Sequence, residues 1–552
     1  MSRRTPFSLT KATEMRRFFL GIHGCILAAL SMGCDRKTEC ATCGTVVVAA
    51  VGEPASVFPP LTYESVGRDI GDLVYERLAD LIPQRATIDE AAYTPALASG
   101  WDRVDSVTWR FTLRAGARWH DGKPVTAADV QYSFGVFGDS VVDAVARSQL
   151  ASISAVEPVD STTVLIRFTH PYGEQLYDAT YHVRVIPKHV WETAGDRSSW
   201  PEDTTTSRLI GSGPYRFSTW QRGQSLTLVA DTSLPTPPEI RRVVWRFAGD
   251  PEAAANLVLS HEADLLETAH ISGAEQLATD SAYRLLPYPS ASYGLIGFRL
   301  AGDRPRPVDG ILSNRDVRRA LVQSVDRTTV ARAVFGPETK VPPGPISQLL
   351  WIWDNDIKPL SFDTLAAAAA FDAAGWRRGS NGMRARSGRP LRIEILVPST
   401  SSPRRRAAEA VQAQWKTAGV DGVVTLVDFP VMQQRTGAGS FDAFVGAWLD
   451  EPSPRGLAGQ WTRAGWDDLN FGHYHNPVLD SLLLDAGRAT DPAEAARLYR
   501  AVLDTLNADA PAMFLFAPTN IAAVSRRLEM VSINPYSWLS GLPKWQLRDL
   551  AR

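Results

Sequence analysis

Residues 109–133, WRFTLRAGARWHDGKPVTAADVQYS, form the most strongly patterned stretch of this 552-residue chain. At its start, the apolar side chains of Trp109, Phe111 and Leu113 alternate with polar ones. Such a two-residue period is typical of a β-strand that buries one face. The stretch therefore predicts a half-buried strand at residues 109–113.

A turn and a helix start are predicted in the second half of the same stretch. Asp121-Gly122 predicts a turn, because glycine tolerates a positive φ and aspartate can bond to its own downstream backbone. Thr126 has Asp129 three residues later, which is the spacing of a helix capping box. The stretch thus reads as strand, turn and capped helix, and all of these roles are structural.

Length and charge limit the classes of protein to which the chain can belong. A chain of 552 residues is too long for one hydrophobic core, so two or three domains are expected. Its 44% hydrophobic content is ordinary for a globular protein. The 58 Lys and Arg nearly balance the 60 Asp and Glu, which argues against nucleic acid or an anionic membrane as the main partner.

The N-terminus has the pattern of a secretory signal peptide, predicted at residues 1–34. Arg16-Arg17 precede an apolar run that ends near Met32, and the run is short for a membrane-spanning helix. The small residue Gly33 precedes Cys34, which is the predicted site of lipid attachment, although the bulky Met32 departs from the usual lipobox pattern. Ordinary cleavage and a retained anchor are alternatives, and translation from Met15 or export by a twin-arginine route also stay open.

The four cysteines all lie within the first 43 residues. The remainder of the chain therefore has neither a disulfide nor a thiol nucleophile. Cys40 and Cys43 form a CxxC pair without a second pair, and a small disulfide loop or an inert tether is favoured over a redox or zinc role. Residues 35–44 are interpreted as a linker.

Strand and helix patterns alternate in the globular part. Residues 46–51 are continuously apolar, as in a buried strand, and residues 393–397 and 423–427 read as further strands. Between these two, residues 404–416 predict a helix that ends at Gly419. This alternation predicts an α/β fold.

Several motifs in the correct order resemble one protein family. Besides residues 109–133, they are GSGPY at 211–215, NRDVRRALVQSVDR at 314–327 and NFGHYHNPVLDSLL at 470–483. Together they resemble the extracytoplasmic solute-binding proteins of the dipeptide/oligopeptide type, family 5, which serve ABC importers. In that reading, 211–215 is a structural bend, and the charged side chains of 315–327 form a solvated helix face.

The resemblance implies an α/β, two-lobed periplasmic-binding-protein-like fold, type II and cluster C-like, with an extra subdomain in the first lobe. Lobe I would comprise residues 45–75, 206–292 and 508–552, the extra subdomain residues 76–205, and lobe II residues 293–507.

Ligand-binding candidates gather after a strand predicted at residues 441–448. Similar proteins carry an aspartate in the following loop that pairs with the ligand's α-ammonium group. Here the loop is one residue shorter, so either Asp450 or Glu451 is the candidate for that role. Arg455 lies nearby, and Arg299 replaces the family's usual Asn; both departures weaken the expectation of a standard peptide preference.

Aromatic candidates accompany this loop. Trp448, Trp461 and Trp466 could line a pocket, although packing is the alternative for each. Phe58 ends the loop after the first strand, where ligands gather in open α/β sheets.

No catalytic motif is recognised, so an enzyme is not expected. His473 and His475 are two residues apart but lack a third ligand nearby in sequence, so neither a metal nor a cofactor is expected.

The resemblance implies a protein that binds a peptide-like solute between its lobes and delivers it to an ABC permease. We expect a periplasmic or extracytoplasmic monomer without nucleic acid, attached to the membrane only through a lipid anchor. A sensory binding protein of the same fold is the first alternative, and a secreted hydrolase is the second.

Overall fold

The computed structural model of the chain describes residues 44–548, except 63, 143, 203–205, 270, 301–308 and 467. Cys34 and the predicted signal peptide lie outside the described residues. From Gly44 onward the chain forms one compact unit. Among the described helices, none is both long and apolar enough to cross a membrane.

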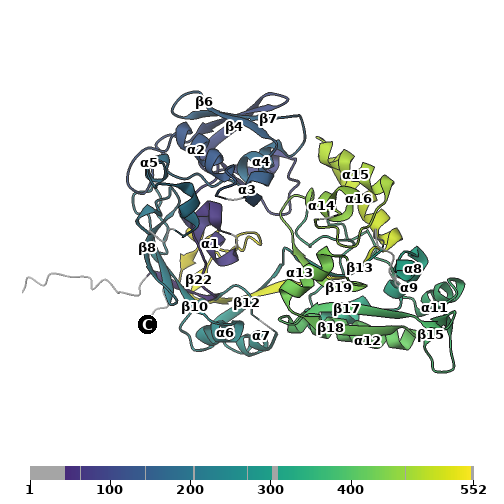
Figure 1. Cartoon of the computed structure of the whole chain (residues 1–552). Helices are drawn as coiled ribbons and strands as arrows, with labels where there is room; N and C mark the ends of the chain where they lie inside the picture. The colour runs from purple at the N-terminus through teal and green to yellow at the C-terminus, as the bar shows by residue number, and fades with distance from the viewer. Residues whose placement is uncertain are drawn as a thin grey trace, which may run out of the picture. The chain divides into compact units, whose positions relative to one another are not determined.

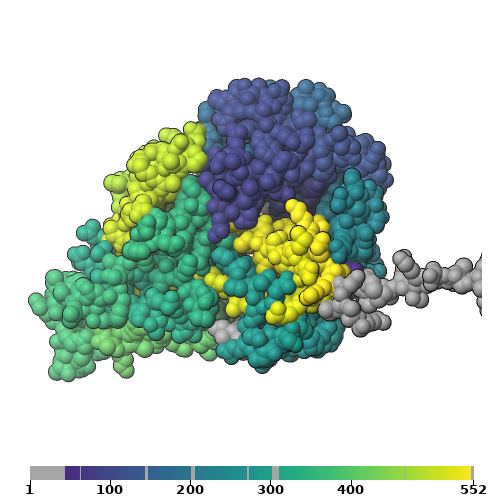
Figure 2. Space-filling model, turned by 180° about the vertical axis from the view of Figure 1, so that it is seen from behind, coloured from purple at the N-terminus to yellow at the C-terminus, as the bar shows by residue number. Residues whose placement is uncertain are grey.

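A seven-stranded sheet collects three separate stretches of the chain. Its strand order is β12-β21-β11-β1-β10-β9-β8. β1 runs parallel to β10 and β11, whereas the other neighbours are antiparallel. Figure 2 shows the yellow C-terminal segment beside teal segments, in agreement with the pairing of β21 and β12. The strands are β1 (Thr45–Val51), β8 (Tyr215–Gln221), β9 (Ser225–Ala230), β10 (Arg242–Ala248), β11 (Leu265–Leu266), β12 (Tyr283–Pro289) and β21 (Thr519–Ser525).

A five-stranded sheet is built mainly from later residues. Its order is β18-β17-β19-β13-β20, and β17 runs parallel to both β18 and β19. The predicted helix after β17 is present and ends at Gly419, whose φ is +89°. It packs on β17 and β18 (Figure 1). The strands are β13 (Ser292–Phe298), β17 (Arg392–Pro398), β18 (Asp421–Val427), β19 (Ala443–Leu449) and β20 (Ala512–Phe516).

Residues 109–133 contribute to a four-stranded sheet, in the order β4-β5-β7-β6, and to the helix that packs on it. The predicted strand is β5, and the predicted helix is α2, which contacts β6 and β7. Thr126 and Asp129 form the expected capping box, and Gly122 has the expected positive φ, at +87°. The strands are β4 (Ala98–Asp105), β5 (Thr108–Leu113), β6 (Ile153–Pro158) and β7 (Thr163–Phe168).

The helices connect and cover these sheets. They are α1 (Ser65–Val74), α2 (Ala127–Phe137), α3 (Ala144–Gln149), α4 (Gln175–Thr180), α5 (Lys188–Trp191), α6 (Pro251–Leu259), α7 (Ile271–Ala278), α8 (Asp309–Leu312), α9 (Arg315–Gln323), α10 (Arg327–Phe335), α11 (Thr364–Ala373), α12 (Ser402–Ala418), α13 (Phe429–Gly437), α14 (Gly456–Trp461), α15 (Pro477–Arg488) and α16 (Pro492–Asp509). Short strand pairs complete the fold: β2 (Ala79–Leu81) with β3 (Tyr93–Pro95), β14 (Arg377–Arg378) and β16 (Arg389–Pro390) with β15 (Arg384–Arg386), and β22 (Leu528–Glu529) with β23 (Gln546–Leu547).

Helix α9 is amphipathic as predicted, because Val317, Ala320 and Leu321 are fully buried. The prediction of a solvated face is wrong for two of the charged side chains. Arg327 is only 6% exposed, and its guanidinium donates to Phe514 O at 2.9 Å. Arg318 is only 5% exposed. Its guanidinium donates to the backbone carbonyls of Leu312, Asp509 and Ala510, so it satisfies helix ends rather than a carboxylate partner.

Candidate functional site

The acidic loop follows the carboxyl end of β19, the central strand of the five-stranded sheet. β19 pairs with β13 as far as Leu449, which faces Ser292. Asp450 N–H then donates to Ala291 O at 2.7 Å and continues the ladder by one residue. The position of Asp450 is therefore fixed by sheet pairing rather than by a free loop.

The carboxylate of Asp450 is partly buried. Its Oδ2 accepts a hydrogen bond from the backbone N–H of Ser347 at 2.6 Å. Burial raises the pKa of Asp450 to about 7, although the bonds from Ser347 act in the opposite direction. A cationic partner would stabilise the ionised form of this carboxyl group, because an ammonium ion compensates for the hydration that the carboxylate loses on burial.

Glu451 faces a different set of residues from its neighbour. Gln149 Nε2 donates to Glu451 Oε1 at 2.8 Å, although 302 positions separate the two residues. The side chain is exposed, and the guanidiniums of Arg455 and Arg68 are the charged groups that act on it most strongly. Asp450 and Glu451 thus present two separate acidic positions.

Arg455 is engaged by two acidic residues near α4. Its Nη1 donates to Asp178 Oδ2 at 3.1 Å, and its Nε pairs with Glu174. Burial raises the pKa of both Glu174 and Asp178, and these two carboxylates raise the pKa of the Arg455 guanidinium despite its own burial. Ser453 Oγ also donates to Glu174 Oε2, at 2.6 Å. Arg455 therefore already has two acidic partners within the chain.

The three candidate tryptophans have packing partners. Trp448 is half-buried and stacks on Tyr293, with ring centroids 6.1 Å apart. Trp461 is 8% exposed and packs edge-on against Phe514. Trp466 stacks on His473 at 4.8 Å.

Phe58 lies inside the core that is formed around the seven-stranded sheet. Its side chain is 4% exposed and stacks on Trp191, with ring centroids 3.9 Å apart. Trp200 packs edge-on against the same ring at 5.9 Å. The contacts of Phe58 are therefore with other core aromatics.

Residues 170–182, HPYGEQLYDATYH, bring functional groups that sequence reasoning did not select. Glu174 and Asp178 lie four residues apart, as do Tyr177 and Tyr181, so each pair shares one side of a helical turn. This local concentration of acids and tyrosines was the available signal. Their partners in residues 449–455 could not be known from spacing, because about 275 residues intervene.

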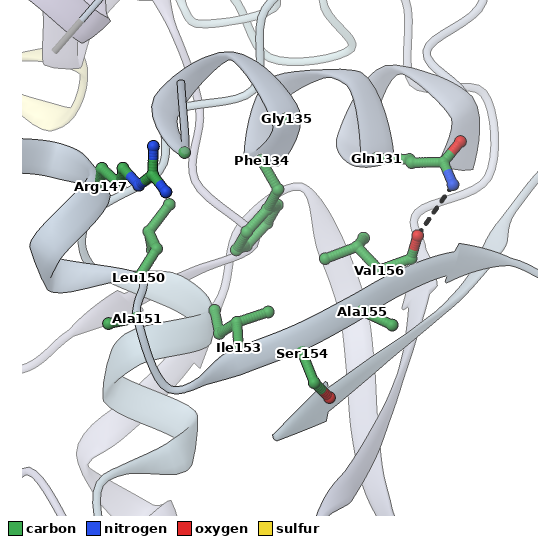
Figure 3. A pocket seen from close by; sticks show the side chains of 11 residues that line it. Gln131, Phe134, Gly135, Arg147, Leu150, Ala151, Ile153, Ser154, Ala155 and Val156 are labelled. Atoms are coloured by element: carbon green, nitrogen blue, oxygen red, sulfur yellow. Dashed lines mark hydrogen bonds between the residues drawn. The ribbon is translucent and has the colours of Figure 1, made fainter. Parts of the chain in front are cut away.

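Two cavities are clear among the described residues. One, of about 940 Å³, adjoins Arg455 and is lined by Tyr172, Leu483 and Tyr499, among others. A second, of about 550 Å³, lies between α2 and β6 (Figure 3). Phe134 and Ile153 project into it, and Gln131 spans its edge by donating to Val156 O at 2.9 Å. Only the first contains a residue of the acidic loop.

The comparisons with known proteins agree with this architecture. The sequence pattern of the bacterial extracellular solute-binding proteins, family 5 (middle region), matches residues 92–467. Protein XP55 of Streptomyces lividans is 28% identical over 523 residues, covering 93% of this chain and 91% of that protein. The oligopeptide-binding protein AppA of Bacillus subtilis is 23% identical over 518 residues, covering 91% of this chain and 92% of that protein.

A solved structure supports the same fold. The structure of AppA from Bacillus subtilis in complex with a nonapeptide has a TM-score of 0.71 and 22% sequence identity, and the match covers 91% of this chain and 98% of that one. The predicted two-lobed, periplasmic-binding-protein-like α/β fold is therefore confirmed. The family match spans well over half of the chain, and this protein belongs to the bacterial extracellular solute-binding proteins, family 5.

Proposed function

We propose that this protein binds a peptide or peptide-like solute and delivers it to an ABC permease, with Asp450 as the partner of the ligand's terminal ammonium group. The observation that carries the proposal is the position of Asp450 at the end of β19, where Ala291 O and Ser347 N–H hold it and burial raises the pKa of its carboxyl group to about 7. A ligand ammonium would form a charge-assisted hydrogen bond there. The names of the relatives support a peptide as the solute.

Between the two acidic candidates, the contacts favour Asp450 over Glu451. Asp450 is held by the ladder and by Ser347, so its carboxylate is fixed in direction before the ligand arrives. Glu451 is exposed and takes its hydrogen bond from a side-chain amide. We infer that Trp448, which lies directly before this loop, offers its half-buried ring to the ligand. Trp461 and Trp466 would support the same region through packing. Phe58 would contribute through the aromatic core around the seven-stranded sheet.

The lobes are inferred to close about a hinge and bury the solute. Lobe I would comprise residues 45–75 and 206–292 with the C-terminal segment, residues 76–205 would form the extra subdomain, and lobe II would start at 293. The sheet memberships support this division, with one adjustment. Because β20 pairs with β13, we place the return to lobe I after Phe516 rather than at residue 508.

The protein is further proposed to act outside the cytoplasm as a monomer, after removal of the signal peptide and lipidation of Cys34. The family match supports the extracytoplasmic location. The lipid anchor rests on the sequence around Cys34. Labelling cells with a radioactive fatty acid tests it, since a Cys34→Ser variant should lose the label.

The proposed ligand can be identified by mass spectrometry of the full-length protein purified under native conditions. We expect peptides with free N-termini to be released on denaturation, and Asp450→Asn to be depleted of them. Asp485→Asn, at an exposed position on α15, is the matched control and should retain them. Recovery of a non-peptide solute, or equal recovery from Asp450→Asn, would contradict the proposal.

A further inference from the structure

Residues 373–393, AAGWRRGSNGMRARSGRPLRI, contain six arginines and no acidic residue, in a chain whose acidic and basic residues nearly balance. Five of these arginines lie in β14, β15 and β16, which pair as a three-stranded sheet. We call these three strands the arginine sheet. Figure 1 shows β15 at the margin of the fold, next to α11. The positive charge of this stretch is therefore gathered on one small peripheral sheet.

Strand pairing in the arginine sheet places arginines directly opposite one another. Arg378 of β14 faces Arg384 of β15, and Arg386 of β15 faces Arg389 of β16. A two-residue turn at 387–388, with positive φ at both positions, fixes the second pair. Like charges at opposite positions of an antiparallel pair repel one another, so each pair destabilises the sheet unless an anion compensates for it.

An acidic side chain compensates the first pair but not the second. Arg384 is 3% exposed, and its Nη1 donates to Asp372 Oδ1 at 2.7 Å. Arg386 and Arg389 are both exposed, and neither forms an ion pair with any described residue. The charge of this second pair is therefore available to an anion from outside the chain.

Two further exposed guanidiniums accompany this pair, those of Arg377 and Arg378, and within the described ranges neither is in an ion pair. Arg378 Nη2 donates to Thr417 O at 2.9 Å. The guanidinium of Arg386 lies over the ring of Trp376, 4.7 Å from its centroid. These contacts hold the two side chains in place and use few of the five N–H donors that each guanidinium carries. The arginine sheet thus offers preorganised donors to phosphate groups, which guanidiniums bind through paired hydrogen bonds.

The placement of the guanidiniums favours an extended anionic surface over a single small anion. Arg377 faces Ala385 in the strand register, so it projects to the opposite face of the sheet from its neighbour Arg378. Side chains on two faces of a peripheral sheet cannot converge on one phosphate ion. They can each contact a different phosphate group on a surface that the sheet approaches edge-on.

We propose that the arginine sheet binds the anionic phospholipid headgroups of the membrane to which the protein is inferred to be anchored. This contact goes beyond the proposed function, because it does not involve the peptide site. It would add a second attachment to the lipid expected at Cys34, and lipid chains and basic patches act together in holding proteins at membranes. Each arginine close to an anionic surface should strengthen binding by roughly fivefold.

Sedimentation with vesicles tests the proposal, using the full-length Cys34→Ser protein so that no attached lipid contributes. The vesicles are of phosphatidylcholine, with or without anionic phosphatidylglycerol. We expect binding to be roughly tenfold or more tighter with phosphatidylglycerol, and the difference to shrink at high salt. Adding Arg386→Gln with Arg389→Gln should weaken binding to the anionic vesicles by roughly twentyfold. Adding lysine at both positions instead should preserve most of the binding, because the charge is retained.

The matched control is Arg332→Gln with Arg488→Gln, which removes the same charge from exposed positions near the ends of α10 and α15 and should leave binding unchanged. All variants share one N-terminus, so differences among them report on the substituted positions. Equal binding to both kinds of vesicle, or an equal loss in the control, would overturn the inference. Binding to polyglutamate but not to the anionic vesicles would assign the arginine sheet to an acidic protein and would also overturn it.

Discussion

Arg455 and Asp178 form a two-pronged ion pair although 277 positions of sequence separate them. The guanidinium comes from the loop after β19, and the carboxylate comes from α4. Glu174 binds the same guanidinium through Nε. The loop that carries Asp450 and Glu451 is thereby held against α4 and the residue before it. We infer that the geometry of the loop depends on these ion pairs of Arg455.

Replacing Arg455 with methionine is expected to destabilise the protein. Glu174 and Asp178 would stay buried without their cation, and removal of one partner from a buried pair costs about 3–5 kcal/mol. Because 31% of the Arg455 side chain is exposed, we expect roughly 2–3 kcal/mol in urea denaturation. Arg497→Met, which breaks a surface pair with Glu494, is the control and should change little. Equal stability of Arg455→Met and the unaltered protein would show that the pair does not stabilise the fold.

Peptide affinity is expected to depend on pH through Asp450. An ammonium group binds the ionised carboxylate, and the pKa of Asp450 in the free protein is about 7. Below that value the affinity should fall by about tenfold per pH unit, because the carboxylate must first lose a proton. Above it the affinity should level off until the peptide's own amine deprotonates at about pH 8. Calorimetry across this range is the measurement, and a flat profile below pH 7 would exclude Asp450 as the ammonium partner.

Asp450→Asn is expected to raise the melting temperature of the ligand-free protein at about pH 8. The folded-state pKa of about 7 lies above the ordinary 3.8, so the folded state favours the protonated form. The stability from this group is fully present below the ordinary pKa and is lost as the pH rises through the folded-state value. Asparagine stays neutral, so the gain should nearly vanish at about pH 4. A lower melting temperature for Asp450→Asn at both pH values would contradict this account of the site.

Two glycine substitutions are expected to act in opposite directions. A Cβ atom at Gly211 would lie 1.8 Å from the carbonyl oxygen of Val74, so Gly211→Ala should cost about 3 kcal/mol or more. Gly135 lies in α2 beside the open cavity of Figure 3, where an added Cβ meets nothing within 4 Å. Gly135→Ala should therefore stabilise by up to about 1 kcal/mol through helix propensity. Thermal denaturation of both variants checks the pair, and similar effects would refute the packing argument.

Much of the fold could be predicted because it rests on local patterns. Only a few neighbouring residues determine each of three features: the alternation at 109–113, the capping box at Thr126, and the left-handed conformation of Gly419 at the end of α12. Such signals survive in any tertiary context that buries the same face. A helical pattern shows only that Arg318 lies off the apolar face of its helix. The prediction of a solvated side chain was wrong because the carbonyl groups of Asp509 and Ala510, which come from a distant part of the chain, accept its hydrogen bonds.

The candidate site was only partly predictable for a related reason. Asp450, Glu451, Arg455 and Trp448 are consecutive or nearly so, and a single loop identifies them. Their partners are Ser347, Gln149 of α3 and Asp178 of α4, and only tertiary folding brings these together. The sequence could therefore identify the acidic loop but not the residues that contact it.

The central claim is that Asp450 binds the free ammonium group of a peptide. Calorimetric titration with a peptide and with its N-acetylated form tests this most directly, using peptides recovered from the native protein. We predict that acetylation weakens binding to the unaltered protein by roughly tenfold or more and has little effect on the residual binding to Asp450→Asn. Equal affinity of the unaltered protein for both forms would contradict the account.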